Sequence, residues 1–224
     1  MFNNKERKLE RLNQIVNIDE EVSESKYNLY LGACVCYGFL MNAISVALWE
    51  DFFLSINPIV FLVGYFISCI AGTIIAVGSR NPLISFLGYN LIVLPIGGLL
   101  TISLGVYTGA DILLAMSLTG IVTLIMTLLS IAKPDFFRGL GKTLFLSLIL
   151  GIIVEIIAII LGFSTTIFDF FFVVIFALYI GYDYVKAQDY PKTVDNAIDS
   201  AIDIYLDIIN LFLRILSIIA KSDD

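Results

Sequence analysis

Apolar runs of about 20 residues, separated by short polar breaks, account for most of the chain after residue 26. A helix of that length crosses the hydrocarbon core of a bilayer, and the breaks carry turn-forming pairs such as Asn57-Pro58, Asn81-Pro82 and Lys133-Pro134. The pattern therefore predicts an all-α membrane protein, a bundle of seven transmembrane helices. These helices are expected at residues 27–49, 58–79, 83–104, 112–132, 142–162, 167–186 and 197–220.

The parts outside these runs are short. Residues 1–26 form a polar N-terminal segment, expected in the cytoplasm, residues 27–220 form the transmembrane domain, and residues 221–224 are a short tail. Of the 224 residues, 59% are hydrophobic and 15% are charged, whereas a soluble domain carries about a quarter charged residues. The composition excludes a soluble protein and indicates a lipid bilayer as the partner of the outer helix surfaces.

Lysine and arginine occur in alternate breaks, and these residues stay on the cytoplasmic side of a membrane. The breaks at residues 50–57, 105–111 and 163–169 contain neither. We therefore expect an integral, multi-pass protein with a cytoplasmic N-terminus and an outer C-terminus, in the cell membrane if the source is prokaryotic. Eleven of the 13 basic residues lie on the predicted cytoplasmic side, namely Lys5, Arg7, Lys8, Arg11, Lys26, Arg80, Lys133, Arg138, Lys142, Lys186 and Lys192.

Composition also excludes several kinds of chemistry. A net charge of −7 without a basic cluster argues against nucleic acid as a partner. The chain contains no histidine, which excludes imidazole metal ligands and Ser-His-Asp catalysis. Cys34, Cys36 and Cys69 lie in apolar runs, where a thiol packs as a small hydrophobe. We therefore expect no enzymatic activity and no cofactor.

The last apolar run carries a stripe of acids, because Asp195, Asp199, Asp203 and Asp207 follow one another at four-residue steps on one helix face. For Asp195 and Asp199, an amphipathic helix on the membrane surface with its acids in water is an equal alternative. Asp207 lies deep in the run, where a carboxylate in contact with lipid costs several kcal/mol. It should face the protein interior or a water-filled cavity.

A second acid, Asp183, ends the sixth run, and the predicted hairpin around Pro191 brings its helix beside the seventh. The two carboxyl groups lie at unequal distances from the turn, so the spacing alone does not decide whether they make contact. Arg80 ends the second run on the same predicted side and is either an available cation or a membrane anchor. Glu155, alone inside the fifth run, is a secondary candidate.

The residues around both aspartates match a known signature. Tyr182-Asp183 and the stretch Tyr205-Leu206-Asp207-Ile208-Ile209-Asn210-Leu211-Phe212 resemble the C-terminal pattern of the transmembrane Bax inhibitor motif family, also called the Bax inhibitor-1 family, in its prokaryotic form. Residues 78–98 and the seven-span layout are similar as well. The resemblance implies a seven-helix bundle with a central last helix and a calcium-permeable, proton-sensitive leak pathway.

The same resemblance implies roles for single residues. Asp183 and Asp207 would be the paired acids of the pore and proton sensor, and Arg80 the cation that latches them. The chain departs from the family at Val185, where glutamine is frequent, and Lys186 follows. The accessory acidic stripe, which consists of Asp195, Asp199 and Asp203, has no counterpart in the family pattern.

These observations predict a pH-sensitive calcium leak channel. Calcium prefers hard oxygen ligands, and Asp183 with Asp207 could hold it transiently while a proton competes for the same oxygens. Calcium and protons are thus the expected partners, and protein partners are unknown. A cation/proton antiporter using the same acids and a pore-free membrane scaffold are the alternatives. An intramembrane aspartyl protease is disfavoured, because the Gly-x-Gly-Asp motif is absent at Asp207.

Overall fold

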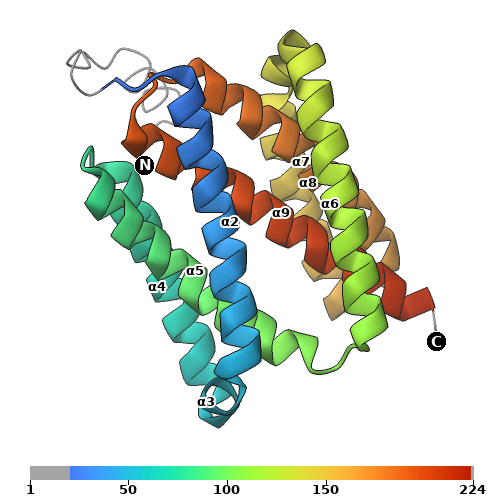
Figure 1. Ribbon diagram of the computed structural model, residues 1–224. Coiled ribbons are helices and arrows are strands. Elements are labelled where there is room, and N and C mark those ends of the chain that lie inside the picture. Colours follow the sequence, from blue (N-terminus) through green and yellow to red (C-terminus); the bar gives the residue numbers. More distant parts are fainter. Residues whose placement is uncertain (1–20, 223–224) are drawn as a thin grey trace. The chain divides into compact units, whose positions relative to one another are not determined.

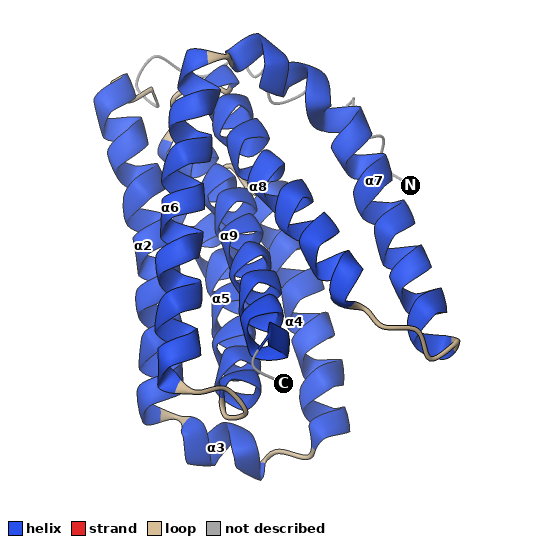
Figure 2. Ribbon diagram, turned by 90° about the vertical axis from the view of Figure 1, so that its right-hand side faces the viewer, coloured by secondary structure: helices blue, strands red, loops and turns tan. Residues whose placement is uncertain are grey.

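The computed structural model describes residues 21–222, and helices are the regular elements throughout this range (Figure 1; Figure 2). Their labels run from α2 to α9. The bounds are Glu24–Leu48 for α2, Glu50–Ser55 for α3, Pro58–Gly78 for α4, Pro82–Leu104 for α5, Gly109–Ala132 for α6, Pro134–Ile160 for α7, Thr166–Asp189 for α8 and Val194–Ser222 for α9.

The helix starts follow from the polar breaks. Asn57 and Asn81 accept hydrogen bonds from backbone N–H groups of the first turns of α4 and α5, and a proline takes the first helical position in both. Thr108 and Asp111 form a reciprocal capping box at the start of α6. These side chains satisfy donors that would otherwise lack a partner, so each apolar run begins its helix at its polar break.

Each predicted run contains one helix, and the prediction of an all-α membrane protein is confirmed. Among the described residues, six helices, α2 and α4 to α8, are long and apolar enough to cross a membrane, and α9, which contains the predicted seventh span, is not among them. The helix count differs by one, because residues 50–55 form the short helix α3 in place of a loop. α7 also begins earlier than expected, at Pro134, because Asp135 pairs with Arg138 at 2.8 Å and lets the helix continue through a polar first turn.

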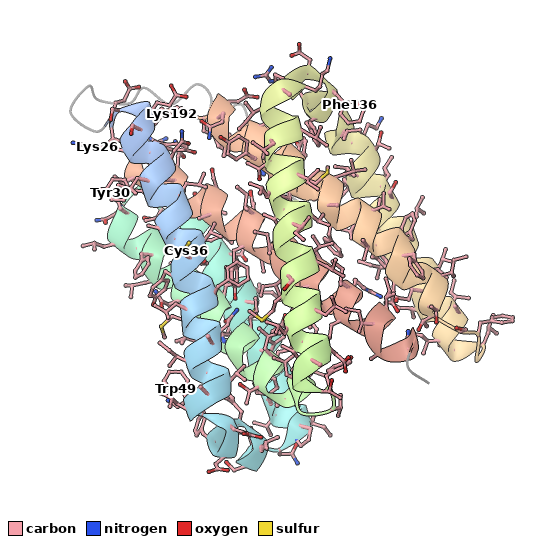
Figure 3. All side chains as sticks on the ribbon, turned by 45° about the vertical axis from the view of Figure 1, so that its right-hand side comes forward. Lys26, Tyr30, Cys36, Trp49, Phe136 and Lys192 are labelled. Atoms are coloured by element: carbon pink, nitrogen blue, oxygen red, sulfur yellow. The ribbon has the colours of Figure 1, made fainter. Side chains whose placement is uncertain are left out.

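The described chain divides into two compact units. The first unit comprises residues 21–106 and 189–202, hence α2 to α5 with the N-terminal part of α9. α4 packs on α5 at two glycines: a Cβ atom on Gly72 would lie 2.5 Å from the backbone oxygen of Gly88, which only glycine permits. The backbone N–H of Val22 donates to the carbonyl of Lys192 at 2.8 Å. Figure 3 accordingly shows Lys26 and Lys192 at one end of this unit and Trp49 at the far end of α2.

The second unit comprises residues 107–188 and 203–222, hence α6 to α8 with the C-terminal part of α9. Glycines set the spacing of α7 and α8. A Cβ atom on Gly141 would lie 2.6 Å from the hydroxyl oxygen of Tyr182, and one on Gly181 would overlap the ring of Phe137. The rings of Phe137 and Tyr182 thus bridge the two helices along the turn of α8 that carries Asp183.

Burial separates α9 from the other long helices. No residue from 191 to 220 is exposed, whereas α4, α6 and α7 present many exposed leucine and isoleucine side chains. Exposed aliphatic surface of this kind suits lipid. α9 has the opposite pattern, with polar groups covered by protein, as expected for an interior helix. The N-terminal segment to residue 20 and residues 223–224 of the predicted tail lie outside the described residues.

Candidate functional site

The two predicted acids meet in the second unit. Asp183, near the end of α8, is 7% exposed, and Asp207, in the middle of α9, is 8% exposed. Their carboxyl groups lie within hydrogen-bond reach of each other. Two carboxyl groups so placed form a hydrogen bond when one of them carries a proton, and such a pair titrates as a unit.

The two acids differ in their remaining contacts. Asp183 Oδ1 accepts a hydrogen bond from the Lys186 ammonium at 3.0 Å. Asp207 Oδ2 is buried and has no hydrogen-bond partner among the described residues. A buried carboxyl oxygen without a donor is costly unless a ligand, water or ion satisfies it. A proton shared with Asp183 or a bound ligand would satisfy this oxygen.

Lys186 links the pair to the acidic stripe. Its Nζ donates to Asp203 Oδ2 at 2.7 Å as well as to Asp183, so one ammonium bridges α8 and α9. The side chain of Asp203 is 39% exposed, whereas that of Asp183 is 8% exposed. Sequence reasoning noted Lys186 as a basic residue of the predicted cytoplasmic side and as the neighbour of Val185, but not as a partner of Asp183. Its position three residues after Asp183 on one helix is the signal that could have identified the contact.

Aromatic side chains line the same turn of α8. The rings of Tyr179, one turn before Asp183, and of Tyr182, directly before it, meet edge to face with centroids 6.3 Å apart. Tyr182 in turn packs on Gly141 of α7. The position of Asp183 is thus fixed by close helix packing on one side and by the Lys186 ion pair on the other.

A second charged cluster lies in the same unit and contains the secondary candidate. The Arg214 guanidinium of α9 binds both carboxyl oxygens of Glu155, with Nη2 at 2.8 Å from Oε2, and reaches Asp169 Oδ1 at 2.9 Å. Asp169 also accepts from Ser217 at 2.9 Å and from Lys221 at 2.7 Å. The charges of the two carboxylates are balanced by those of Arg214 and Lys221. The cluster joins α7, α8 and α9, and sequence reasoning missed Asp169 because its partners lie far along the chain.

The rest of the acidic stripe lies in the first unit. Asp195 and Asp199 are 7% and 4% exposed, so the alternative of a surface helix with these acids in water is wrong. Asp195 Oδ1 accepts a hydrogen bond from the Ser85 hydroxyl at 2.5 Å. Beside them, the hydroxyls of Tyr27 and Ser200 share a hydrogen bond of 3.3 Å. This end of α9 is therefore covered by α2 and α5.

Arg80 lies at the end of α4 in the first unit, where it is exposed. It forms no ion pair with any residue from 21 to 222. Its role as a latch of Asp183 and Asp207 stays a prediction. Over the same range, no group of three or more Cys, Asp or Glu side chains is arranged to hold a metal ion.

Comparison with known proteins identifies relatives of the whole arrangement. Residues 22–224 match the protein family described as "Inhibitor of apoptosis-promoting Bax1". Two proteins of Helicobacter pylori, from strains 26695 and J99 and both named as uncharacterized, are each 32% identical to this chain over 115 residues. The alignment covers 49% of this chain and 48% of each relative, so the chain spans about half the length of the curated relatives it matches.

Proposed function

The chain belongs to the family of Bax1 inhibitors, membrane proteins built from apolar helices, and from this premise we propose that it is a calcium leak channel whose permeation site is the Asp183–Asp207 pair. One observation carries the proposal. Two buried carboxyl groups from different helices lie within hydrogen-bond reach of each other, and no N–H or hydroxyl group among the described residues donates to Asp207 Oδ2. Ionisable groups inside a membrane protein are rare and mark ion or proton pathways.

The chemistry of the pair suits weak binding of a divalent cation. Calcium takes six to eight oxygen ligands, and two carboxylates with carbonyls and water can supply them. A site with only two protein carboxylates holds the ion weakly enough to release it, which permeation requires. Loss of the shared proton would free both carboxylates for calcium. The proposed activity is passive, with no catalytic step and no cofactor.

Proton competition makes the proposed leak pH-sensitive. At low pH the shared proton occupies the oxygens that calcium needs, and at higher pH it leaves. Calcium affinity should therefore rise with pH. In the family resemblance, Arg80 would stabilise the closed arrangement by pairing with the ionised acids, and this latch is part of the proposal.

The shared proton also supports a second candidate, a cation/proton antiporter that exchanges a proton on the pair for a cation. Calcium uptake into liposomes that contain only the purified protein separates the two. A channel gives uptake that follows an imposed membrane potential at equal pH on both sides. An antiporter needs an outward proton gradient and expels protons as calcium enters. A protein that gives neither flux is a scaffold, and this result would contradict both proposals.

A further inference from the structure

The cation nearest to the proposed calcium site belongs to the chain itself. Lys186 Nζ lies 3.0 Å from Asp183 Oδ1 and 2.7 Å from Asp203 Oδ2. The carboxyl group of Asp183 lies within hydrogen-bond reach of that of Asp207, whose Oδ2 is buried and accepts from no N–H or hydroxyl group of the described residues. The Lys186 ammonium therefore binds carboxylate oxygens that a bound cation would use as ligands.

An ammonium and a calcium ion cannot use these oxygens together. Calcium binds carboxylate oxygen at 2.3–2.6 Å, closer than the lysine nitrogen does, and it carries twice the charge. Like charges at contact distance also repel each other more strongly in a protein site than in bulk water. Calcium on Asp183 would thus displace the Lys186 ammonium.

Lys186 is able to move in this way. Its side chain is 23% exposed, and its second acceptor, Asp203, is 39% exposed on the side chain, so the ion pair borders the protein surface. A lysine stem is long and flexible, with a strongly hydrated head. The ammonium can leave Asp183 and stay close to Asp203.

We propose that Lys186 is a tethered counter-cation of the Asp183–Asp207 site. Its ammonium occupies this site in the absence of calcium, and calcium must displace the ammonium in order to bind. This inference rests on the proposed function and adds how calcium binding at that site is regulated. The lysine sets the calcium affinity. It also excludes monovalent cations, because they compete poorly with an ammonium that is already bound. The three carboxyls and Lys186 act as one unit.

Calcium binding to the purified full-length chain at pH 8 tests the proposal through the variants Lys186→Gln and Lys186→Arg. Removal of the charge should raise the calcium affinity by about tenfold or more, which corresponds to about 1.4 kcal/mol. The Arg variant keeps the charge and should bind within about threefold of the parent. Lys221→Gln is the matched control, because Lys221 pairs with Asp169 in the other charged cluster. An affinity of Lys186→Gln equal to or below that of the parent overturns the inference.

A second measurement needs no variant and so does not depend on correct folding of one. Acylation of lysine amines, located by peptide mass spectrometry, reports whether each ammonium is free. Saturating calcium should increase the acylation rate of Lys186 several-fold and leave that of Lys221 unchanged, and an unchanged rate at Lys186 overturns the inference. Asp207→Asn separates this failure from failure of the proposed function. If Asp207→Asn and the parent bind calcium equally well, the proposal that calcium binds at the Asp183–Asp207 pair is wrong.

Discussion

At the level of single residues, the three carboxyls around Lys186 differ in their exposure to water. Asp183 and Asp207 are almost fully buried, and Asp203 is partly exposed. Water screens a charge and substitutes for lost contacts at an exposed position, but not at a buried one. Buried members of the cluster should therefore contribute more to cation binding than Asp203.

The variants Asp183→Asn and Asp203→Asn measure this difference. Loss of a buried charge partner costs about 2 to 5 kcal/mol, so Asp183→Asn should lower the calcium affinity on the order of a hundredfold. Asp203→Asn should lower it by no more than about tenfold, because solvent screens the exposed position. Isothermal titration of calcium into detergent-solubilised protein gives both values. Equal losses would contradict the ranking by burial.

At the level of helices, a side-chain contact between α7 and α8 positions Asp183, because Gly181 leaves room for the buried ring of Phe137. α9 is held to the same helices by Arg214, which binds Glu155 and Asp169 and lies 4.3 Å from the centre of the Phe172 ring. The Gly181–Phe137 contact and the Arg214 ion pairs thus involve different residues of these helices. Each makes a separate prediction for stability.

Gly181→Ala should destabilise the protein by about 1 to 3 kcal/mol, since the added methyl group overlaps the Phe137 ring and forces the helices apart. Thermal unfolding in detergent measures the loss. Gly139→Ala is the matched control in α7, where nothing lies within 4 Å of an added Cβ atom. That variant should be neutral or slightly stabilised, as alanine favours helix over glycine. Equal melting temperatures for both variants would show that the contact at Gly181 is unimportant.

Arg214→Met should destabilise the second unit by about 2 to 3 kcal/mol, because it leaves Glu155 and Asp169 with too few cations in a partly buried position. Replacing Glu155 with Gln in the same chain should recover part of the loss. Unfolding of the single and double variants in detergent gives the coupling between the two residues. Normal stability of Arg214→Met, combined with altered calcium flux, would instead assign the cluster to the ion pathway.

At the level of the whole molecule, the helices were predictable from sequence because about 20 consecutive apolar residues have few structures available other than a membrane helix. Helix α3 was not predictable in this way, because Glu50–Ser55 begins with two acids, a pattern typical of a loop. The Asp183–Asp207 contact followed from motif resemblance rather than from spacing. Arg214, Glu155 and Asp169 come together across three helices, and no local pattern signals such a contact.

Membrane orientation remains a prediction from the basic residues. In a chain without its native cysteines, Ser164→Cys in the connection between α7 and α8 should react with an impermeant thiol reagent added to intact cells. Lys133→Cys, in the preceding connection, should react only after permeabilisation. Both positions are exposed. The reverse labelling pattern would place the N-terminus outside.

The most direct test of the central claim is the calcium affinity of the parent and of Asp207→Asn between pH 5 and pH 8. If the buried carboxyl pair binds calcium in competition with a shared proton, the parent affinity rises with pH as the proton leaves. Asp207→Asn should bind weakly at every pH and show little dependence on it, because the shared proton and one carboxylate are both gone. Superimposable curves for the two proteins, or a parent affinity independent of pH, would contradict the account.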